Sequence, residues 1–277
     1  MSDNSFSQEI KSFYSSGKEA TRLLSKALGA FERKRTNSIL KRYLPSKPCV
    51  ILDIGGGAGI YAFDLAGQAH IVYLLDPIPL HIEQARKQAG EHPGSSQLAG
   101  YTVGDARELP YPDTYADVVL LFGPLYHLLE HKDRMQAVSE AYRTLKPGGL
   151  VLAAGISRYA SVLDAFTSDI ISDKAVQAML KTDVTTGCHY SPEGLQYFTT
   201  AYFHKPEELE QELLAAGFSN IELLAIEGPL FNLPNFEAIW QDENKRALLF
   251  WFTQAIEKER SLLGASAHFM ALGYKSS

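Results

Sequence analysis

Short apolar runs alternate with segments of helical spacing through the middle of this chain. Five apolar runs have the length of buried strands, at residues 50–54, 71–75, 101–103, 116–122 and 150–154. Three segments between them carry apolar residues at helical spacing, at residues 60–66, 80–89 and 134–145. Strands that alternate with helices predict a mostly parallel sheet with helices on both faces. We therefore predict an α/β fold with a doubly wound, Rossmann-like sheet.

The two flanking parts of the chain follow other patterns. Helical spacing fills residues 5–45 and predicts two or three helices that end at Leu44-Pro45. Residues 157–200 lose the alternation, which predicts an insertion over one edge of the sheet. Beyond the insertion we expect a helix at 206–217, a strand at 221–226, a long helix at 243–263 and a last, antiparallel strand at 267–274.

The length of 277 residues allows one large domain, and no linker or internal repeat divides the chain. With 45% hydrophobic and 21% charged residues, the composition excludes disordered and collagen-like classes. We predict a single domain with four parts: a helical cap at 1–45, a core of alternating strands and helices at 48–156, an insertion or lid at 157–204, and a C-terminal part at 205–277 that completes the sheet around a helical insertion.

Charge and cysteine content limit the partners and the compartment. The 26 basic and 32 acidic residues give a net charge of -6, which disfavours binding to the nucleic acid backbone. Two cysteines build no disulfide framework, and the polar N-terminus predicts no signal peptide. The longest apolar stretches, 118–125 and 247–252, are too short to span a bilayer. We expect a soluble cytoplasmic protein without nucleic acid or membrane partners, whose oligomeric state the composition does not indicate.

The chemistry of the chain starts at a glycine-rich turn. The first predicted strand leads directly into Gly55-Gly56-Gly57-Ala58-Gly59, and a helix follows. Such a turn exposes backbone N–H groups at a helix N-terminus and lets a ligand approach the backbone closely. The stretch from Gly57 to Ala62 also fits the dinucleotide fingerprint G-x-G-x-x-A, with Asp76 placed to bind a ribose diol. A turn that binds nothing is the third interpretation.

Three further features favour another adenosine cofactor. Asp53 at the end of the first strand completes a D-x-G-x-G-x-G pattern, which a dinucleotide site that starts at Gly57 does not require. Asp105 follows the third strand, where a carboxylate can accept a hydrogen bond from an exocyclic amine. A Leu-Lys-Pro-Gly-Gly turn at 145–149 enters the fifth strand. With these motifs, residues 48–155 resemble the class I S-adenosylmethionine-dependent methyltransferases, and residues 1–45 resemble the helical caps of members that act on small molecules.

The resemblance implies S-adenosylmethionine as the cofactor and assigns roles to the matching residues. In the family, the glycine loop cradles the methionine part, which corresponds here to Gly55, Gly57 and Gly59. The acidic residue after the second strand binds both ribose hydroxyls and matches Asp76, whereas the one after the third strand contacts adenine and matches Asp105. The full set of expected cofactor-binding residues is Asp53, Gly55, Gly56, Gly57, Gly59, Asp76, Pro77, Asp105, Ala106 and Phe122.

The acceptor is expected beyond the fourth strand, at the edge where open α/β sheets bind ligands. Family members that methylate nucleobase amines often have Asn or Asp, Pro, Pro and an aromatic residue there, but this chain has Gly123-Pro124-Leu125-Tyr126. The side chain that would hold a base amine is therefore missing. We predict a small organic or short peptide acceptor, methylated on oxygen or nitrogen. His127 is the candidate base, because an imidazole can accept a proton near neutral pH, and Tyr126 is the candidate that orients the acceptor.

Other polar and aromatic residues are weaker candidates. Tyr14 and Arg35 in the cap and Arg158 and Tyr159 after the fifth strand are expected to contact the acceptor, although ordinary ion pairing would also explain the arginines. His127 and His131 have helical spacing, but without a third ligand no metal site is predicted. Aromatic residues in the insertion favour a flat or apolar acceptor if they do not only pack together: Tyr190, Tyr197, Tyr202 and Phe203.

A methyltransferase is thus the favoured function, with two alternatives. An NAD(P)-dependent oxidoreductase could use a similar sheet, but Asp53 and Asp105 disfavour it. A non-catalytic protein that binds S-adenosylmethionine is compatible with the same motifs, because an in-line methyl transfer can proceed without an essential side chain.

Overall fold

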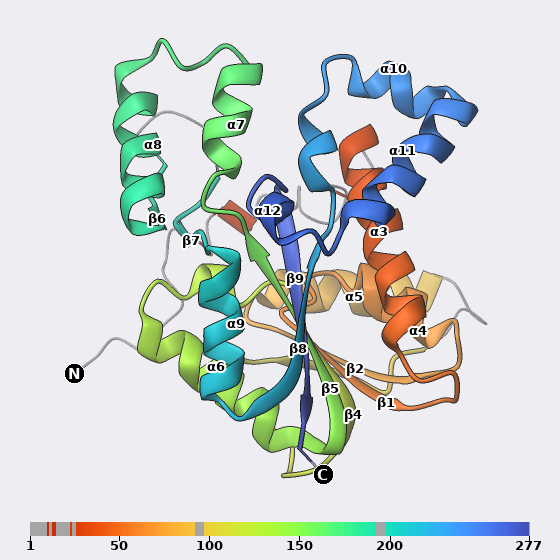
Figure 1. Cartoon of the computed structure of the whole chain (residues 1–277). Coiled ribbons are helices and arrows are strands. Elements are labelled where there is room, and N and C mark those ends of the chain that lie inside the picture. The colour runs from red at the N-terminus through yellow and green to blue at the C-terminus, as the bar shows by residue number, and fades with distance from the viewer. Residues whose placement is uncertain are drawn as a thin grey trace.

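The computed structural model describes residues 10, 13, 14, 23, 26–91, 97–191 and 198–276. Most of the first predicted helical segment, before residue 26, therefore lies outside the described residues. The helix that follows, α3 (Ala27–Tyr43), ends where Leu44 turns to an extended conformation, as the Leu44-Pro45 signal predicts. Figure 1 shows α3 at one side of a central sheet, with the C-terminus at the lower end of the molecule.

A seven-stranded sheet forms the centre of the molecule, in the order β3-β2-β1-β4-β5-β9-β8. Strands β1 to β5 are parallel, and β9 is antiparallel to both of its neighbours. The predicted fold class, including the antiparallel last strand, is confirmed. The strands are β1 (Val50–Ile54), β2 (Ile71–Asp76), β3 (Gly100–Val103), β4 (Ala116–Leu121), β5 (Leu145–Ile156), β8 (Phe218–Ala225) and β9 (His268–Lys275).

Helices cover both faces of the sheet, as expected when the strands carry apolar side chains on both sides. One core cluster joins the sheet to α3, α4 (Ile60–Ala66) and α5 (Pro79–Glu91). The other joins it to α6 (His131–Thr144) and α9 (Pro206–Ala215). Because β1 pairs with β2 on one side and β4 on the other, the chain reverses its winding direction at β1. Open α/β sheets bind their ligands at such a switch point.

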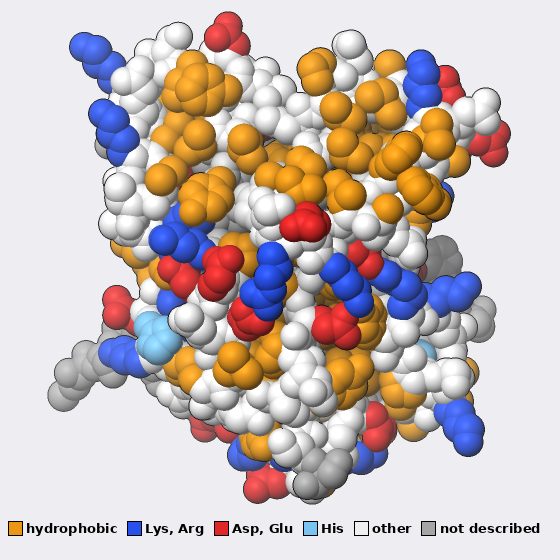
Figure 2. Space-filling model, viewed as in Figure 1, with side chains coloured by type: hydrophobic (Ala, Val, Ile, Leu, Met, Phe, Trp, Pro, Cys, Tyr) orange, Lys and Arg blue, Asp and Glu red, His pale blue; other side chains and the backbone are white. Residues whose placement is uncertain are grey.

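The predicted insertion contains two helices and a short hairpin. These elements are α7 (Ala160–Thr167), α8 (Lys174–Thr186), β6 (Cys188–His189) and β7 (Ala201–Tyr202). The short helix η1 (Leu125–His127) precedes the insertion, between β4 and α6. A second group beyond β8 consists of η2 (Gly228–Asn232), α10 (Phe236–Gln241), α11 (Glu243–Ile256) and α12 (Arg260–Leu263). Figures 1 and 2 show the two groups as raised parts above the sheet, with hydrophobic side chains on both. The division into parts of one domain stays a prediction.

Two predicted elements differ most from the structure. The long helix expected at 243–263 breaks into α11 and α12, because the carbonyl oxygen of Glu257 accepts a hydrogen bond from the backbone of Ala225 in β8. Strand β5 begins at Leu145, directly after α6, rather than at Leu150. The Lys-Pro-Gly-Gly turn therefore lies within the strand, where Gly148 has a φ of 76°. Within the described residues, no helix is long and apolar enough to cross a membrane.

Candidate active site

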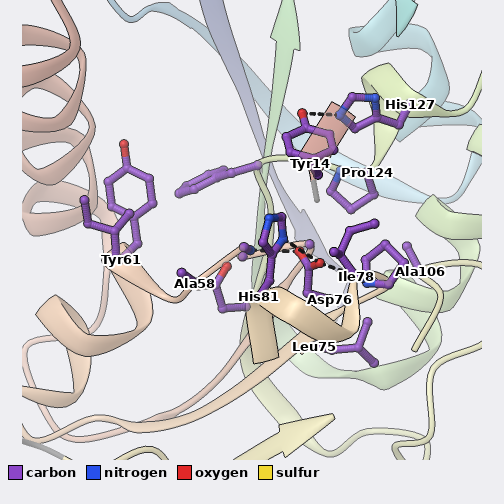
Figure 3. A pocket seen from close by; sticks show the side chains of 18 of the residues that line it. Tyr14, Ala58, Tyr61, Leu75, Asp76, Ile78, His81, Ala106, Pro124 and His127 are labelled. Atoms are coloured by element: carbon purple, nitrogen blue, oxygen red, sulfur yellow. Dashed lines mark hydrogen bonds and ion pairs between the residues drawn. The ribbon is translucent and has the colours of Figure 1, made fainter. Parts of the chain in front are cut away.

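A cavity of about 460 Å³ lies at the carboxyl ends of β1, β2 and β4 (Figure 3). The sequence pattern places it here, because each of these strands ends in the loop that leads to its next helix. Of the ten residues expected to bind the cofactor, nine line this cavity: Asp53, Gly55, Gly56, Gly57, Asp76, Pro77, Asp105, Ala106 and Phe122. The tenth, Gly59, is the N-cap of α4, where its φ of 85° suits glycine.

The glycine turn gives the cavity an open backbone floor. Gly55 and Gly57 have φ values of 72° and 59°, which side chains other than glycine rarely adopt. A Cβ atom on Gly55 would lie 2.7 Å from the Cδ of Pro124, so this glycine permits close packing. A Cβ atom on Gly57 would meet nothing closer than the Nδ1 of His81, 4.0 Å away. The space in front of Gly57 is therefore available to a ligand.

Asp53 is fully buried at the end of β1. Neither of its carboxylate oxygens has a hydrogen-bond partner among the described residues. Burial, together with the negative charge of Asp76, raises the pKa of Asp53 to about 7. An unpaired buried carboxylate is costly, and a cationic or hydrogen-bond-donating ligand would relieve this cost.

Asp76 is held in place by its own loop. Its Oδ2 accepts a hydrogen bond from the backbone N–H of Gly57, and its Oδ1 accepts one from Ile78, both at 2.9 Å. The Nδ1 of His81 lies 2.9 Å from the same Oδ1, while the Nε2 of His81 is buried without a partner among the described residues. His81 was not among the residues predicted from the sequence. Its only signal was a histidine in the first turn of the helix that follows Asp76.

Asp105 also lines the cavity and precedes Ala106, which Figure 3 places on the side of Asp76 away from Tyr61. Its carboxylate accepts hydrogen bonds from Arg107, with distances of 3.0 Å to Nε and 2.7 Å to Nη2. The Oδ1 also accepts a hydrogen bond from the backbone N–H of Arg107, so both of its acceptor positions are used. The Oδ2 accepts one hydrogen bond, from Nη2, and keeps a second acceptor position, and about a third of the Asp105 side chain is exposed. A further hydrogen bond from an adenine amine therefore remains compatible with the ion pair.

These features fit S-adenosylmethionine. The glycine turn leaves room for the cofactor where a Cβ atom would block it. The polar atoms of Asp53 and His81 that lack a partner among the described residues belong to side chains that line the same cavity, where polar groups of the cofactor can meet them. The Oδ2 of Asp76, which accepts one hydrogen bond from Gly57, can accept another from a ribose hydroxyl, and the Oδ2 of Asp105 can accept one from an adenine amine. Nine of the ten residues predicted from the sequence line the cavity in which the cofactor would bind, and His81 lines it in addition.

His127 lies beside this cavity with an unexpected partner. The structure places its Nε2 2.7 Å from the hydroxyl of Tyr14, which comes from the N-terminal segment (Figure 3). Burial lowers the pKa of His127 to about 4, although a hydrogen bond with the backbone of Thr200 opposes this shift. The imidazole is therefore neutral at pH 7, and its Nε2 can accept the Tyr14 proton. Tyr126 also lines the cavity, with its ring 4.7 Å from the His127 ring, but Tyr14 forms the hydrogen bond.

Aromatic rings surround the Tyr14–His127 pair. Phe198 stacks on His127 with ring centres 5.9 Å apart, and Phe13 packs edge-on against both Tyr14 and Phe198. Phe13 and Phe198 were not predicted from the sequence. Among the aromatic residues it proposed instead, Tyr190 is exposed, Tyr202 packs on Arg134, Phe203 is buried against His189, and Tyr197 lies outside the described residues.

Of the four residues expected to contact the acceptor, only Tyr14 lines the cavity. The structure places the other three elsewhere. Arg35 is fully buried between α3 and the sheet, where it pairs with Glu257 at 2.5 Å. Arg158 bonds to the carbonyl oxygen of Phe203 and pairs with Glu208 at 2.6 Å. Tyr159 is partly exposed and packs near Gly264. The arginines are therefore structural, because tertiary partners occupy their guanidinium groups.

We expect Arg35→Met to destabilise the fold by about 3 kcal/mol, since it breaks a buried ion pair and leaves carbonyl groups of the sheet without a donor. Urea unfolding measures this loss. Arg42 also pairs with Glu257, but its side chain is 31% exposed, so Arg42→Met should cost about 1 kcal/mol or less. Equal losses in the two variants would contradict the structural role assigned to Arg35.

Comparisons with known proteins identify the class of protein. A family model described as a methyltransferase domain matches residues 52–153. A ubiquinone/menaquinone biosynthesis C-methyltransferase of Neisseria meningitidis is 29% identical over 177 residues, which are 62% of this chain and 67% of that protein. A demethylmenaquinone methyltransferase of Deinococcus radiodurans is 29% identical over 185 residues, which cover 63% of this chain and 70% of the relative.

Solved structures show the same fold. An S-adenosylmethionine-dependent methyltransferase of Thermotoga maritima, described as a possible histamine N-methyltransferase, matches with a TM-score of 0.57 at 18% identity and covers 98% of this chain and 100% of its own. A methyltransferase of Methanosarcina mazei matches with a TM-score of 0.57 at 18% identity over 86% and 97% of the two chains. The chain has the fold and the matched domain of the class I S-adenosylmethionine-dependent methyltransferases. It is an enzyme that uses S-adenosylmethionine, and the dinucleotide interpretation of its glycine turn was wrong.

Proposed function

We propose that this enzyme methylates a small organic acceptor that carries an aromatic hydroxyl, either on that oxygen or on an adjacent ring carbon. The observation that carries the proposal is the buried hydrogen bond between Tyr14 and His127, set among aromatic rings beside the cofactor cavity. A flat ring can pack against Phe198 or Phe13, and its hydroxyl can donate to the Tyr14–His127 pair.

Proton removal makes such an acceptor reactive at two positions. A deprotonated aromatic hydroxyl places negative charge on its oxygen and on the adjacent carbons, so the same base serves methylation at either atom. The sequence predicts transfer to oxygen or nitrogen. The names of the relatives from Neisseria meningitidis and Deinococcus radiodurans, a C-methyltransferase and a demethylmenaquinone methyltransferase, support adding carbon to these possibilities.

Bound S-adenosylmethionine supplies an electrophilic methyl group on a positively charged sulfur. The acceptor oxygen or carbon would take this methyl group, with the electrons of the methyl–sulfur bond left on sulfur. After transfer to a ring carbon, the hydrogen of that carbon would also leave as a proton to the Tyr14–His127 pair, which returns the first proton to the acceptor oxygen and so restores the aromatic ring. The residues of the chain align the acceptor and exclude water. In this proposal the acceptor proton passes to the Tyr14 oxygen while the Tyr14 proton moves to the Nε2 of His127.

The acceptor class is tested by methyl turnover on a panel of phenols, hydroquinones and primary amines of similar size, with mass spectrometry and NMR to locate the new methyl group. We expect turnover on aromatic hydroxyl compounds, with the methyl on oxygen or the adjacent carbon. Turnover confined to amines would reject this acceptor class. That result would favour an ammonium acceptor held by the aromatic rings around Tyr14.

A further inference from the structure

The charges that line the cofactor cavity are unequal. Four carboxylates line it, and among the described lining residues Arg33 is the only lysine or arginine. S-adenosylmethionine has a positively charged sulfur and an ammonium group, which suit carboxylates. It has one anionic group, the α-carboxylate of its methionine part. Charge complementarity alone therefore directs this carboxylate toward Arg33.

Arg33 is held rigidly in the cavity wall. It lies on α3, and its Nε and Nη2 donate to the carboxylate of Asp64 on α4 at 3.2 Å and 2.8 Å. Asn37 donates to the same carboxylate at 3.0 Å. These bonds do not use the Nη1 of Arg33, and 30% of the side chain is exposed. A guanidinium fixed along one side in this way presents its remaining N–H groups in a defined direction.

The position of Arg33 suits one end of an extended cofactor. Asp64 follows Tyr61 by three residues on α4, so the two lie on one face of this helix. In Figure 3, Tyr61 lies far from Ala106, with Asp76 and His81 between them. A cofactor with its ribose at Asp76 and its adenine near Ala106 would extend its methionine part past the glycine turn toward α4.

We propose that Arg33 binds the α-carboxylate of the methionine part of the cofactor and thereby selects cofactors that carry this group. The assignment concerns the cofactor alone and does not depend on which acceptor is methylated. Asp64 is the positioning residue, because it orients the guanidinium without facing the carboxylate itself.

Calorimetric titration with two ligands tests the assignment. S-adenosylhomocysteine carries the amino acid carboxylate, and 5′-methylthioadenosine has the same nucleoside without the amino acid part. We expect Arg33→Met to weaken S-adenosylhomocysteine by about 10- to 100-fold, the effect of losing a charge-assisted hydrogen bond, while 5′-methylthioadenosine binds as in the wild type. The affinity of Arg33→Lys for S-adenosylhomocysteine should lie between those of the wild type and Arg33→Met. Lysine keeps the positive charge but lacks the forked N–H groups of the guanidinium.

Lys34→Met provides the matched control, since Lys34 is the neighbouring cation and does not line the cofactor cavity. Both ligands should bind this variant with wild-type affinity. Retained binding of 5′-methylthioadenosine by Arg33→Met also shows that the variant is folded. Unchanged affinity of Arg33→Met for S-adenosylhomocysteine, or an equal loss of both ligands in a variant with wild-type circular dichroism and Tm, would overturn the proposal.

Discussion

Gly57→Val is expected to abolish measurable binding of S-adenosylhomocysteine while the sheet remains folded. The backbone at this position has a φ of 59°, and its missing Cβ faces the open cavity near His81. A branched side chain would fill the space of the ligand and would also strain the turn, because L residues with a branched Cβ rarely adopt a positive φ. Calorimetric titration and circular dichroism together measure binding and folding.

Gly148→Val separates these two effects. Gly148 has a φ of 76°, and a Cβ atom there would meet nothing within 4 Å. The residue lies in β5, away from the cavity, so this variant carries similar backbone strain without an obstructed ligand. It should lose about 1 to 2 kcal/mol of stability and keep its affinity for the cofactor. Normal binding by Gly57→Val would show that the glycine turn does not contact the cofactor.

His127→Ala is expected to lower kcat by about 10²- to 10⁴-fold, the usual contribution of a positioned general base. Affinity for S-adenosylhomocysteine should change little, because His127, the assigned proton acceptor, acts on the substrate through its hydrogen bond with Tyr14. Tyr14→Phe removes the hydroxyl of the relay and should lower kcat in the same direction. His131→Ala is the control, since the His131 side chain is 69% exposed and should contribute nothing to turnover.

The pH dependence distinguishes a buried base from an ordinary histidine. With its pKa at about 4, His127 stays unprotonated as pH falls from 8 to 5, so the pH profile of kcat should show no acid limb near pH 6.5.

The same lowered pKa also makes the free energy of unfolding depend on pH. Between pH 6.5 and pH 4 the unfolded chain binds the proton and the folded chain does not, so stability falls as pH falls through this range. His127→Ala should remove this contribution, and wild-type turnover in the variant would reject the base role.

The fold and the cofactor residues were largely predictable because their signals are local. Strand β1 and helix α4 have the predicted bounds, and the glycines between them mark a turn that the chain can form on its own. Asp76 and Asp105 directly follow strands, and parallel strands bring their carboxyl ends to one edge of the sheet. Alternation of short apolar runs with helices was enough to place these groups together.

The acceptor side depended on contacts that sequence spacing does not encode. Tyr14 and His127 are 113 positions apart, and Phe198 reaches them from the insertion, so no local pattern relates the three. Arg35 and Arg158 resembled site residues by position, but the structure pairs Arg35 with the buried Glu257 and Arg158 with the partly exposed Glu208. The sequence by itself determined the sheet, the glycine turn and the acidic residues at the strand ends. Only the tertiary structure decided which residue pairs with His127 and which aromatic rings and which arginine lie at the cavity. Burial and long-range pairing fix the positions of those side chains.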